Sequence, residues 1–374
     1  MNRHPWIFSG AVQSLPDFVD GELLPIASAD GEVLASAYFN RKSSIIGRVV
    51  AWGEHDPFEA LRERTSAAVT LRARLIDGAA TNALRVLNGE GDGVPGLVAD
   101  LYADVLVLQV GTLGIEKLKP FLIERLCELL NPRVVLERSF GSSRKEEGLV
   151  DFQGVLRGEA CASVEVRENG HQFLISFEHA QKTGFFLDQR DMRALVGSLA
   201  KDRTVLNCFS YTGGFSVYAA HGGAKSTTSI DSSKDAIALA RKNLELNRLE
   251  AGRNDCIVAD VFEYLRSVDD GADLIILDPP AFAKKKNHVA QAAKGYNDIN
   301  RLAFEKILPG GIVVTCSCSH YVTEDLFRKI IFSAAREARR EVKIIHKHRQ
   351  AFDHPVSVYH PEGEYLKGFV LQVE

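Results

Sequence analysis

From Thr204 to the C-terminus, apolar runs of strand length alternate with helical patterns, and this alternation constrains the fold more than any other feature. Such alternation is typical of a parallel sheet with crossover helices. One of these helices is the amphipathic stretch from Lys234 to Asn247. The expected strands are Val205 to Ser210, Ser226 to Asp231, Asp255 to Asp260, Asp273 to Asp278, Gly311 to Ser319, Val342 to His346 and Leu366 to Val373. The C-terminal part is therefore predicted to be an α/β domain with a Rossmann-like, seven-stranded sheet.

The residues before this domain follow other patterns. Residues 1–54 alternate short apolar runs with turn residues, which predicts a small β-rich domain. A charged helical linker is expected over 55–75 and a central α+β domain over 76–180, which leaves 181–374 for the α/β domain. The chain of 374 residues, 45% of them hydrophobic, is long and apolar enough to give such domains their own cores.

Charge and cysteine content argue against several classes of protein. A net charge of −4 disfavours coating of nucleic acid by bulk electrostatics, so any contact with RNA must come from local patches. The six cysteines form no Cys-x-x-Cys pair, which indicates neither a disulfide framework nor a structural zinc site, and no metal is expected. The sequence has no signal-peptide pattern and no uninterrupted apolar run of about 18 residues, so we expect a cytoplasmic protein without a membrane segment.

Polar residues follow the first three strands of the predicted sheet, where folds of this kind bind ligands. After the first strand, two glycines from Gly213 onward let the backbone pass close to a ligand. Asp231 follows the second strand and can accept both ribose hydroxyls, while Asp260 follows the third and can meet an adenine amino group. A turn is the competing explanation for the glycines, and a helix N-cap for each aspartate. No third glycine creates a pyrophosphate cradle, which favours S-adenosylmethionine over a dinucleotide.

The fourth and fifth strands end in residues suited to chemistry on a base. Asp278 is followed by Pro279 and Pro280, which fix the backbone and would hold the carboxylate facing a substrate. The fifth strand ends in two cysteines, Cys316 and Cys318. A cysteine and an aspartate at neighbouring strand ends suit covalent attack on a pyrimidine ring.

With these motifs, the part from about Phe185 to Glu374 resembles class I S-adenosylmethionine-dependent methyltransferases. Further stretches make essentially the whole chain similar to the RlmI family of bacterial large-subunit ribosomal RNA cytosine-5 methyltransferases; they are Asn88 to Gly96, Gln181 to Arg190, His354-Pro355 and Pro361 to Phe369. The resemblance implies an N-terminal PUA domain, a central α+β domain and a Rossmann-like catalytic domain. It also implies S-adenosylmethionine as cofactor and 23S ribosomal RNA as partner, and we consider a homodimer.

The reaction implied by the resemblance needs a nucleophilic cysteine. Carbon 5 of cytosine is too weak a nucleophile to take a methyl group directly, so such enzymes first add a thiolate at carbon 6. Cys318 is preferred because it lies nearer the end of the strand and its Ser-Cys-Ser setting fits the family; Cys316 is the alternative. Alternation would place both on one face, and both could instead be core residues. Asp278 would hydrogen-bond the base and stabilise the adduct, while the base that removes the carbon-5 proton is not identified.

The predicted site has three sets of residues. The catalytic residues are Cys318 and Asp278. The cofactor-binding residues are Gln189, Phe209, Tyr211, Thr212, Gly213, Asp231, Asp260 and Asp278. The substrate-binding residues are Pro279, Pro280, Lys284, Lys285 and Lys286, where the lysines contact phosphates unless they form a solvated loop. Two other functions remain open: methylation of an RNA base nitrogen at the Asp-Pro-Pro loop without a cysteine nucleophile, and a non-catalytic RNA-binding role in ribosome assembly.

Overall fold

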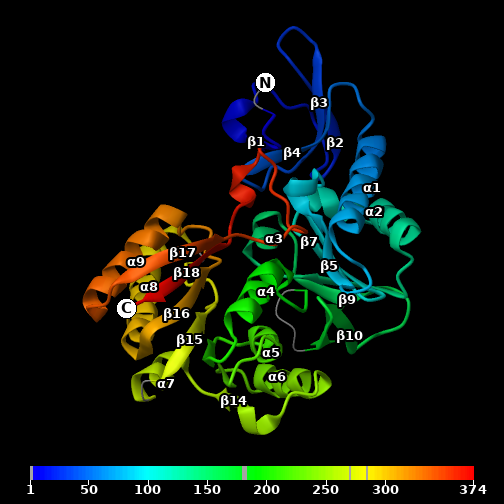
Figure 1. Ribbon diagram of the computed structural model, residues 1–374. Coiled ribbons are helices and arrows are strands. Elements are labelled where there is room, and N and C mark those ends of the chain that lie inside the picture. Colours follow the sequence, from blue (N-terminus) through cyan, green and yellow to red (C-terminus); the bar gives the residue numbers. More distant parts are fainter. Residues whose placement is uncertain (1–2, 179–182, 269–270, 284) are drawn as a thin grey trace. The chain divides into compact units, whose positions relative to one another are not determined.

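The computed structural model describes residues 3–178, 183–268, 271–283 and 285–374, which form two compact units (Figure 1). Unit 1 comprises Met1–Gly170, Ile175–Leu187 and Phe352–Gly363, and unit 2 comprises His171–Leu174, Asp188–Ala351 and Glu364–Glu374. Lys284, which we predicted to bind substrate, lies outside the described residues, as do Gln181 and Lys182. Among the described residues, no helix has the length and apolar content needed to cross a membrane.

In the described part of the chain, two sheets lie wholly within unit 1, and a two-stranded sheet pairs β10 with β11. The first is antiparallel with the order β1-β4-β3-β2, formed by β1 (Trp6–Phe8), β2 (Leu23–Ala27), β3 (Val33–Phe39) and β4 (Ile45–Trp52). The second has the order β5-β6-β7-β8-β9, formed by β5 (Ala83–Asn88), β6 (Leu97–Tyr102), β7 (Val105–Val110), β8 (Val134–Ser139) and β9 (Phe152–Arg157). The remaining elements are α1 (Pro57–Leu75), α2 (Leu113–Leu130), α3 (Ser142–Glu146) and β10 (Ser163–Glu168), while β11 (His171–Ser176) is divided between the units. The β-rich start of the chain is confirmed, and the exact domain boundaries remain predictions.

Unit 2 is built on a seven-stranded sheet with the order β14-β13-β12-β15-β16-β18-β17. The strands are β12 (Thr204–Cys208), β13 (Ser226–Asp231), β14 (Asn254–Val258), β15 (Ala272–Leu277), β16 (Ile307–Ser317), β17 (Val342–His348) and β18 (Lys367–Val373). Strands β12 to β16 are parallel, and β18 is antiparallel to both β16 and β17. The predicted seven-stranded α/β domain is confirmed, with strand ends shifted by a few residues.

Helices cover both faces of this sheet. They are α4 (Arg190–Leu199), α5 (Gly214–His221), α6 (Lys234–Leu246), α7 (Val261–Ser267), α8 (Val289–Lys306) and α9 (Glu324–Ala338). One apolar core joins the sheet to α7, α8 and α9, and a second joins it to α4 and α5 (Figure 1). Successive strand residues alternate between the two cores, as in β15, where Ile275 faces the first and Ile276 the second. Because both of its faces are buried, the central strand β15 is apolar from Leu274 to Leu277 rather than alternating in polarity.

The register of the strands brings the predicted site residues to one edge. Cys208 pairs with Ile230 on one side and with Leu277 on the other, and Leu277 pairs with Thr315. One residue further along each strand, Phe209, Asp231, Asp278 and Cys316 therefore follow at the same level. The carboxyl ends of the parallel strands thus form a continuous edge, which is where ligands bind in open α/β sheets.

Candidate active site

The loop after β12 has an unusual backbone that Asp231 holds in place. Phe209, Tyr211 and Gly213 have positive φ angles of 58°, 47° and 77°. Left-handed conformations of residues other than glycine cost energy and persist where their surroundings fix them, commonly at functional sites. The two oxygens of Asp231 accept hydrogen bonds from the backbone N–H groups of Tyr211 and Ser233, each at 2.9 Å. Asp231 is therefore not a helix cap, and it ties the loop to the end of β13.

Asp260 has a different environment. It is the N-cap of α7, and its Oδ1 accepts a hydrogen bond from the backbone N–H of Glu263 at 3.0 Å. The structure therefore shows the helix N-cap role, which was the alternative to adenine binding. The residue is exposed, and its second carboxylate oxygen can still accept a bond from a ligand. Its role in cofactor binding remains a prediction.

Buried polar atoms around the same loop fit a polar cofactor. Ser210 Oγ, Thr212 Oγ1 and Gln189 Oε1 are buried without a hydrogen-bond partner among the described residues. Buried polar atoms normally find partners, so such atoms at one strand edge call for an explanation by a ligand. A side chain at Gly213 would place its Cβ 3.0 Å from the Cβ of Ala240, so the close approach of the backbone requires glycine. Together with the carboxylate of Asp231, these groups fit the amino-acid and ribose parts of S-adenosylmethionine.

Asp278 and the first cysteine lie close together at the end of β15 and β16. Gln189 Nε2 donates a hydrogen bond to Asp278 Oδ1 at 2.9 Å. Burial raises the pKa of Cys316 well above its usual value, and the nearby charge of Asp278 raises it further. Cys316 has no exposed surface and packs in the core between the sheet, α4 and α5, whereas Cys318 is half-buried beside the same core. Cys318 is thus the more accessible cysteine of the pair, and the choice of Cys318 as nucleophile remains a prediction.

Hydroxyl groups hold the backbone on both sides of Cys318. Ser317 Oγ donates a hydrogen bond to the phenol oxygen of Tyr296 at 3.0 Å, and Ser319 Oγ lies 3.0 Å from the same atom. Ser319 Oγ also accepts a hydrogen bond of 3.3 Å from the backbone N–H of Ala283, which ends the loop begun by Asp278. Ser319 therefore connects the loop that begins at Asp278 to the segment that contains Cys318.

Lys367, at the start of β18, completes the surroundings of Cys318. Its Nζ donates hydrogen bonds of 2.7 Å to the backbone carbonyls of Ser319 and Tyr365. Burial lowers the pKa of Lys367 to about 8, against the opposing influence of Cys318 and Glu364. Lys367 is not among the predicted site residues, although a lysine that begins an otherwise apolar strand is a usable signal.

Aromatic rings connect the cofactor loop to the Cys318 segment. Phe209 lies edge-on to Phe262 of α7, with ring centroids 6.3 Å apart, and Phe262 lies 6.3 Å from Phe282. Phe282 in turn contacts Tyr296, with centroids 4.6 Å apart. Tyr296 could not be identified from the sequence, because a tyrosine on the buried face of a helix is ordinarily a core residue.

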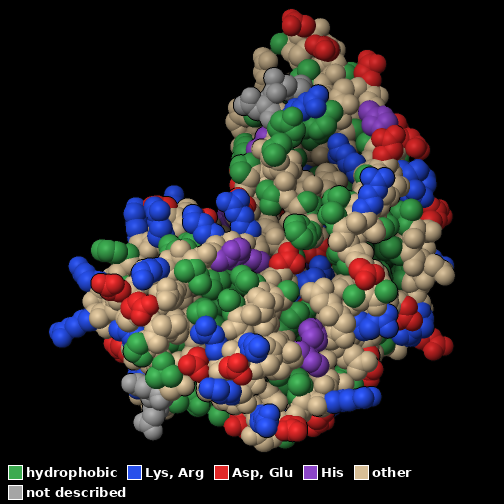
Figure 2. Space-filling view, viewed as in Figure 1, with side chains coloured by type: hydrophobic (Ala, Val, Ile, Leu, Met, Phe, Trp, Pro, Cys, Tyr) green, Lys and Arg blue, Asp and Glu red, His purple; other side chains and the backbone are tan. Residues whose placement is uncertain are grey.

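The predicted substrate-binding residues form the outer part of this edge. Pro279 is buried and Pro280 is exposed, while Lys285 and Lys286 are exposed beyond them. Figure 2 shows that Lys and Arg side chains also gather where Figure 1 places α9 and β17. Because β17 runs in the same direction as β16, its last exposed lysine, Lys347, lies toward the edge that carries Cys318. Lys347 forms an ion pair with Glu324 at 2.6 Å, so the exposed Lys285 and Lys286 are the better candidates for contact with RNA phosphates.

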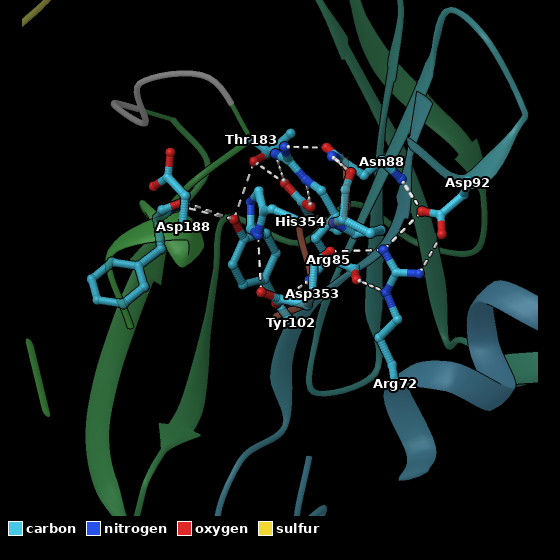
Figure 3. Close-up of polar contacts among 12 residues, drawn as sticks. Arg72, Arg85, Asn88, Asp92, Tyr102, Thr183, Asp188, Asp353 and His354 are labelled. Carbon is cyan, nitrogen blue, oxygen red and sulfur yellow. Dashed lines mark hydrogen bonds and ion pairs between the residues drawn. The ribbon is translucent and has the colours of Figure 1, made fainter. Parts of the chain in front are cut away.

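Several stretches that suggested the family resemblance meet within unit 1 (Figure 3). Arg72 forms two hydrogen bonds with Asp92, at 2.6 and 2.7 Å, and a third with the carbonyl of Asp353 at 2.7 Å. A Cβ at Gly91 would lie 2.0 Å from the carbonyl oxygen of Pro355, so only glycine fits there. These contacts anchor the Phe352–Gly363 segment within unit 1, and the stretches around Gly91 and Pro355 therefore have a structural role.

Comparison with known families and relatives identifies both domains. Residues 151–355 match the family described as S-adenosylmethionine-dependent methyltransferase, and residues 1–52 match the PUA-like domain. The chain is 40% identical over 380 residues to ribosomal RNA large subunit methyltransferase I of Yersinia pestis bv. Antiqua (strain Angola), covering 100% of this chain and 96% of that protein.

Solved structures show the same architecture. SMU.776, described as a candidate methyltransferase and solved in complex with SAH, aligns with a TM-score of 0.85 at 25% identity, covering 99% of this chain and 96% of that one. The tRNA m1G37 methyltransferase of M. jannaschii aligns with a TM-score of 0.50 at 22% identity, covering 75% of this chain and 76% of that one. The second likeness is informative about the fold alone.

Proposed function

The chain belongs to the ribosomal RNA large subunit methyltransferase I family and depends on S-adenosylmethionine, and from this premise we propose that it forms 5-methylcytosine in 23S ribosomal RNA. The observation that carries the proposal is the setting of Cys318. This half-buried cysteine lies between two serines held by one tyrosine, and Ser319 connects it to the loop that begins at Asp278.

The proposed chemistry assigns a separate task to each group. The thiolate of Cys318 adds its electron pair to carbon 6 of the cytosine, which makes carbon 5 nucleophilic. Asp278 hydrogen-bonds ring nitrogen N3 or the exocyclic amine and stabilises the charge that develops on the ring. S-adenosylmethionine supplies the methyl group that carbon 5 gains. A base then removes the carbon-5 proton, the sulfur–carbon bond breaks, and the electron pair returns to sulfur.

The cofactor is held by the other half of the edge. Asp231 is the acceptor for the ribose hydroxyls, and the buried hydroxyls of Ser210 and Thr212 offer further bonds. Gln189 bridges the halves, since its Nε2 donates to Asp278 while its Oε1 has no partner among the described residues. Phe209, Tyr211 and the glycine that follows supply the backbone curvature of the pocket. In this arrangement the cofactor and the base approach each other next to Asp278.

The substrate is ribosomal RNA in this proposal because of the family to which the chain belongs and because exposed lysines follow Pro279 and Pro280. Pro279 and Pro280 present the loop to the base, while Lys285 and Lys286 contact the phosphates next to it. A cytosine must leave its stack to reach Cys318, as in other enzymes that modify bases. A homodimer and a cytoplasmic location remain predictions.

The test is mass spectrometry of nucleosides from ribosomal RNA incubated with the enzyme and labelled S-adenosylmethionine. Wild type, Cys318→Ala and Cys316→Ala are compared. We expect label in 5-methylcytosine for wild type and for Cys316→Ala, and its loss for Cys318→Ala. Label in a methylated amine or ring nitrogen, unaffected by both changes, would overturn the proposal in favour of nitrogen methylation. Absence of any label with a correctly folded wild-type protein would favour a non-catalytic role.

A further inference from the structure

Lys367 occupies a position from which its charge acts on Cys318. Its Cα pairs with that of Ser317 across β16 and β18, and its Nζ donates to the carbonyl of Ser319. Its contacts thus involve the residues directly before and directly after Cys318. The second hydrogen bond, to the carbonyl of Tyr365, fixes the ammonium group in this position.

The positive charge of Lys367 is not compensated by an ion-paired carboxylate among the described residues. No carboxylate forms an ion pair with Lys367 in the part of the chain that the structure describes, and the carbonyls that it contacts are neutral. A buried ammonium group without a counter-ion is unfavourable. The titratable groups whose charges act on it are Cys318 and, on the stretch before β18, Glu364. A thiolate at Cys318 is therefore the anion best placed to compensate the charge of Lys367.

Three of the described titratable groups in the surroundings of Cys318 carry no positive charge. Tyr296 of α8 interacts electrostatically with Cys318, and burial raises the pKa of this phenol, so it is neutral in the physiological range. Cys316 of β16 is buried and also neutral, because burial raises its pKa well above the usual value. Asp278 lies near Cys316 and, as an anion, opposes ionisation of nearby thiols. Lys367, by contrast, brings a positive charge next to this segment.

We infer that Lys367 is a positioning residue for the proposed reaction, and that its ammonium group stabilises the thiolate of Cys318. The inference rests on the proposed function in so far as Cys318 is the nucleophile. A thiolate, and not a thiol, attacks carbon 6, and a neighbouring cation increases the thiolate fraction. The charge on sulfur disappears when the sulfur–carbon bond forms and returns when that bond breaks, so the ammonium group also assists the final elimination.

The test is the pH dependence of alkylation of Cys318 by iodoacetamide, followed peptide by peptide with mass spectrometry. Lys367→Gln keeps two N–H donors for the two carbonyls and removes the charge, while Lys367→Arg keeps the charge. We expect the midpoint for Cys318 to rise by about one pH unit in Lys367→Gln and to change little in Lys367→Arg. Cys161 of unit 1, which is also partly exposed, serves as the reference in the same sample. An unchanged midpoint for Cys318 in Lys367→Gln would overturn the inference.

A second measurement leaves Lys367 intact, in case Lys367→Gln does not fold. The pKa of Lys367 is measured by NMR of protein labelled with 13C at the lysine ε-carbons, in wild type and in Cys318→Ser. Loss of the thiolate should lower the pKa of Lys367, and an unchanged pKa would contradict the inference. Neither measurement requires RNA. Formation of 5-methylcytosine that depends on Cys318 without a shifted midpoint would refute only the role of Lys367, whereas a shifted midpoint without 5-methylcytosine would refute only the proposed function.

Discussion

The two halves of the carboxyl edge in unit 2 are held together in different ways. The cofactor half, after β12 and β13, depends on the backbone: Asp231 accepts two N–H groups and fixes a loop with three positive φ angles. The base half, after β15 and β16, depends on buried side chains, because Tyr296 and Lys367 contact both sides of Cys318. The loop after β12 is thus shaped by contacts that are local in the sequence. The Cys318 segment is instead positioned by residues that are distant in the sequence.

This difference predicts that substitutions in the two halves have separable effects. Changes in the cofactor half should weaken binding of the cofactor, whereas changes in the base half should lower turnover with little effect on that binding. One hydrogen bond, between Gln189 and Asp278, connects the two halves. A substitution of Asp278 is therefore the one most able to change both cofactor binding and turnover.

The largest effect is expected for Asp278→Asn. Asparagine can still accept the hydrogen bond from Gln189 Nε2 through its carbonyl oxygen, so the geometry is kept while the negative charge is lost. Turnover should fall by about 10² to 10³, the usual cost of losing one electrostatic contact to a developing charge. Single-turnover methylation of ribosomal RNA measures this, together with calorimetric binding of S-adenosylhomocysteine. A fall in turnover of less than tenfold would exclude Asp278 from the chemistry.

The next effect concerns the cofactor half. Asp231→Ala removes the acceptor of two backbone N–H groups and of the ribose hydroxyls. The two hydrogen bonds lost from the ribose hydroxyls amount to about 3 kcal/mol. Binding of S-adenosylhomocysteine should therefore weaken about a hundredfold. Asp260→Ala is the matched control and should weaken binding much less, because Asp260 is exposed and caps α7. Equal losses in the two variants would show that the loop after β12 is not specifically held by Asp231.

Unit 2 should also lose stability in acid, because of a buried histidine at the end of β17. Burial lowers the pKa of His348 to about 4, and His346, Asp188 and Arg193 also act on it. An unfolded histidine binds a proton below about pH 6.5 that folded His348 does not bind until about pH 4, so stability falls as the pH decreases through this range. The loss from this group between pH 7 and pH 5 is about 2 kcal/mol.

Urea unfolding at several pH values measures this dependence. His348→Leu should flatten the curve between pH 7 and pH 5, while His346→Gln, at an exposed position of the same strand, should change it only slightly, because burial is the main cause of the lowered pKa of His348. If the slope is the same in His348→Leu as in wild type, the acid sensitivity arises elsewhere.

The smallest effect is expected for Tyr296→Phe. The change removes only the hydroxyl group that contacts Ser317 and Ser319, and keeps the ring against Phe282. We expect a loss of about 1–2 kcal/mol in stability and about a tenfold lower turnover, since the Cys318 segment becomes less well positioned. Binding of S-adenosylhomocysteine should stay within about twofold of wild type, because a nearly preserved ring disturbs the cofactor half little. A larger loss of cofactor binding than of turnover would contradict the separation of the halves.

The sequence was informative about the cofactor half because its determinants are local. Asp231 and the glycines after β12 follow directly from strands that the apolar pattern identifies. The base half was predictable only for the residues at the strand ends, Asp278 and Cys318. Tyr296 reaches Cys318 from a helix about twenty residues upstream, and such a contact depends on tertiary packing that periodicity does not report.

Two other results show where sequence patterns are ambiguous. Asp231 and Asp260 stand at equivalent places in the sequence, yet only Asp260 caps a helix, because Ser233 performs that role for α6. The stretch around Gly91 contributed to the family resemblance, although its contact with Pro355 is structural. A family motif therefore identifies residues that the fold requires as readily as residues that the chemistry requires.

The most direct test of the covalent mechanism is incubation of the enzyme and S-adenosylmethionine with ribosomal RNA that contains 5-fluorocytosine. Fluorine replaces the proton that must leave carbon 5, so a covalent intermediate cannot be resolved. The account predicts a stable protein–RNA adduct whose peptide map places the nucleotide on Cys318, and no adduct in Cys318→Ala. An adduct on Cys316, or methylation of cytosine-containing RNA by Cys318→Ala, would contradict it.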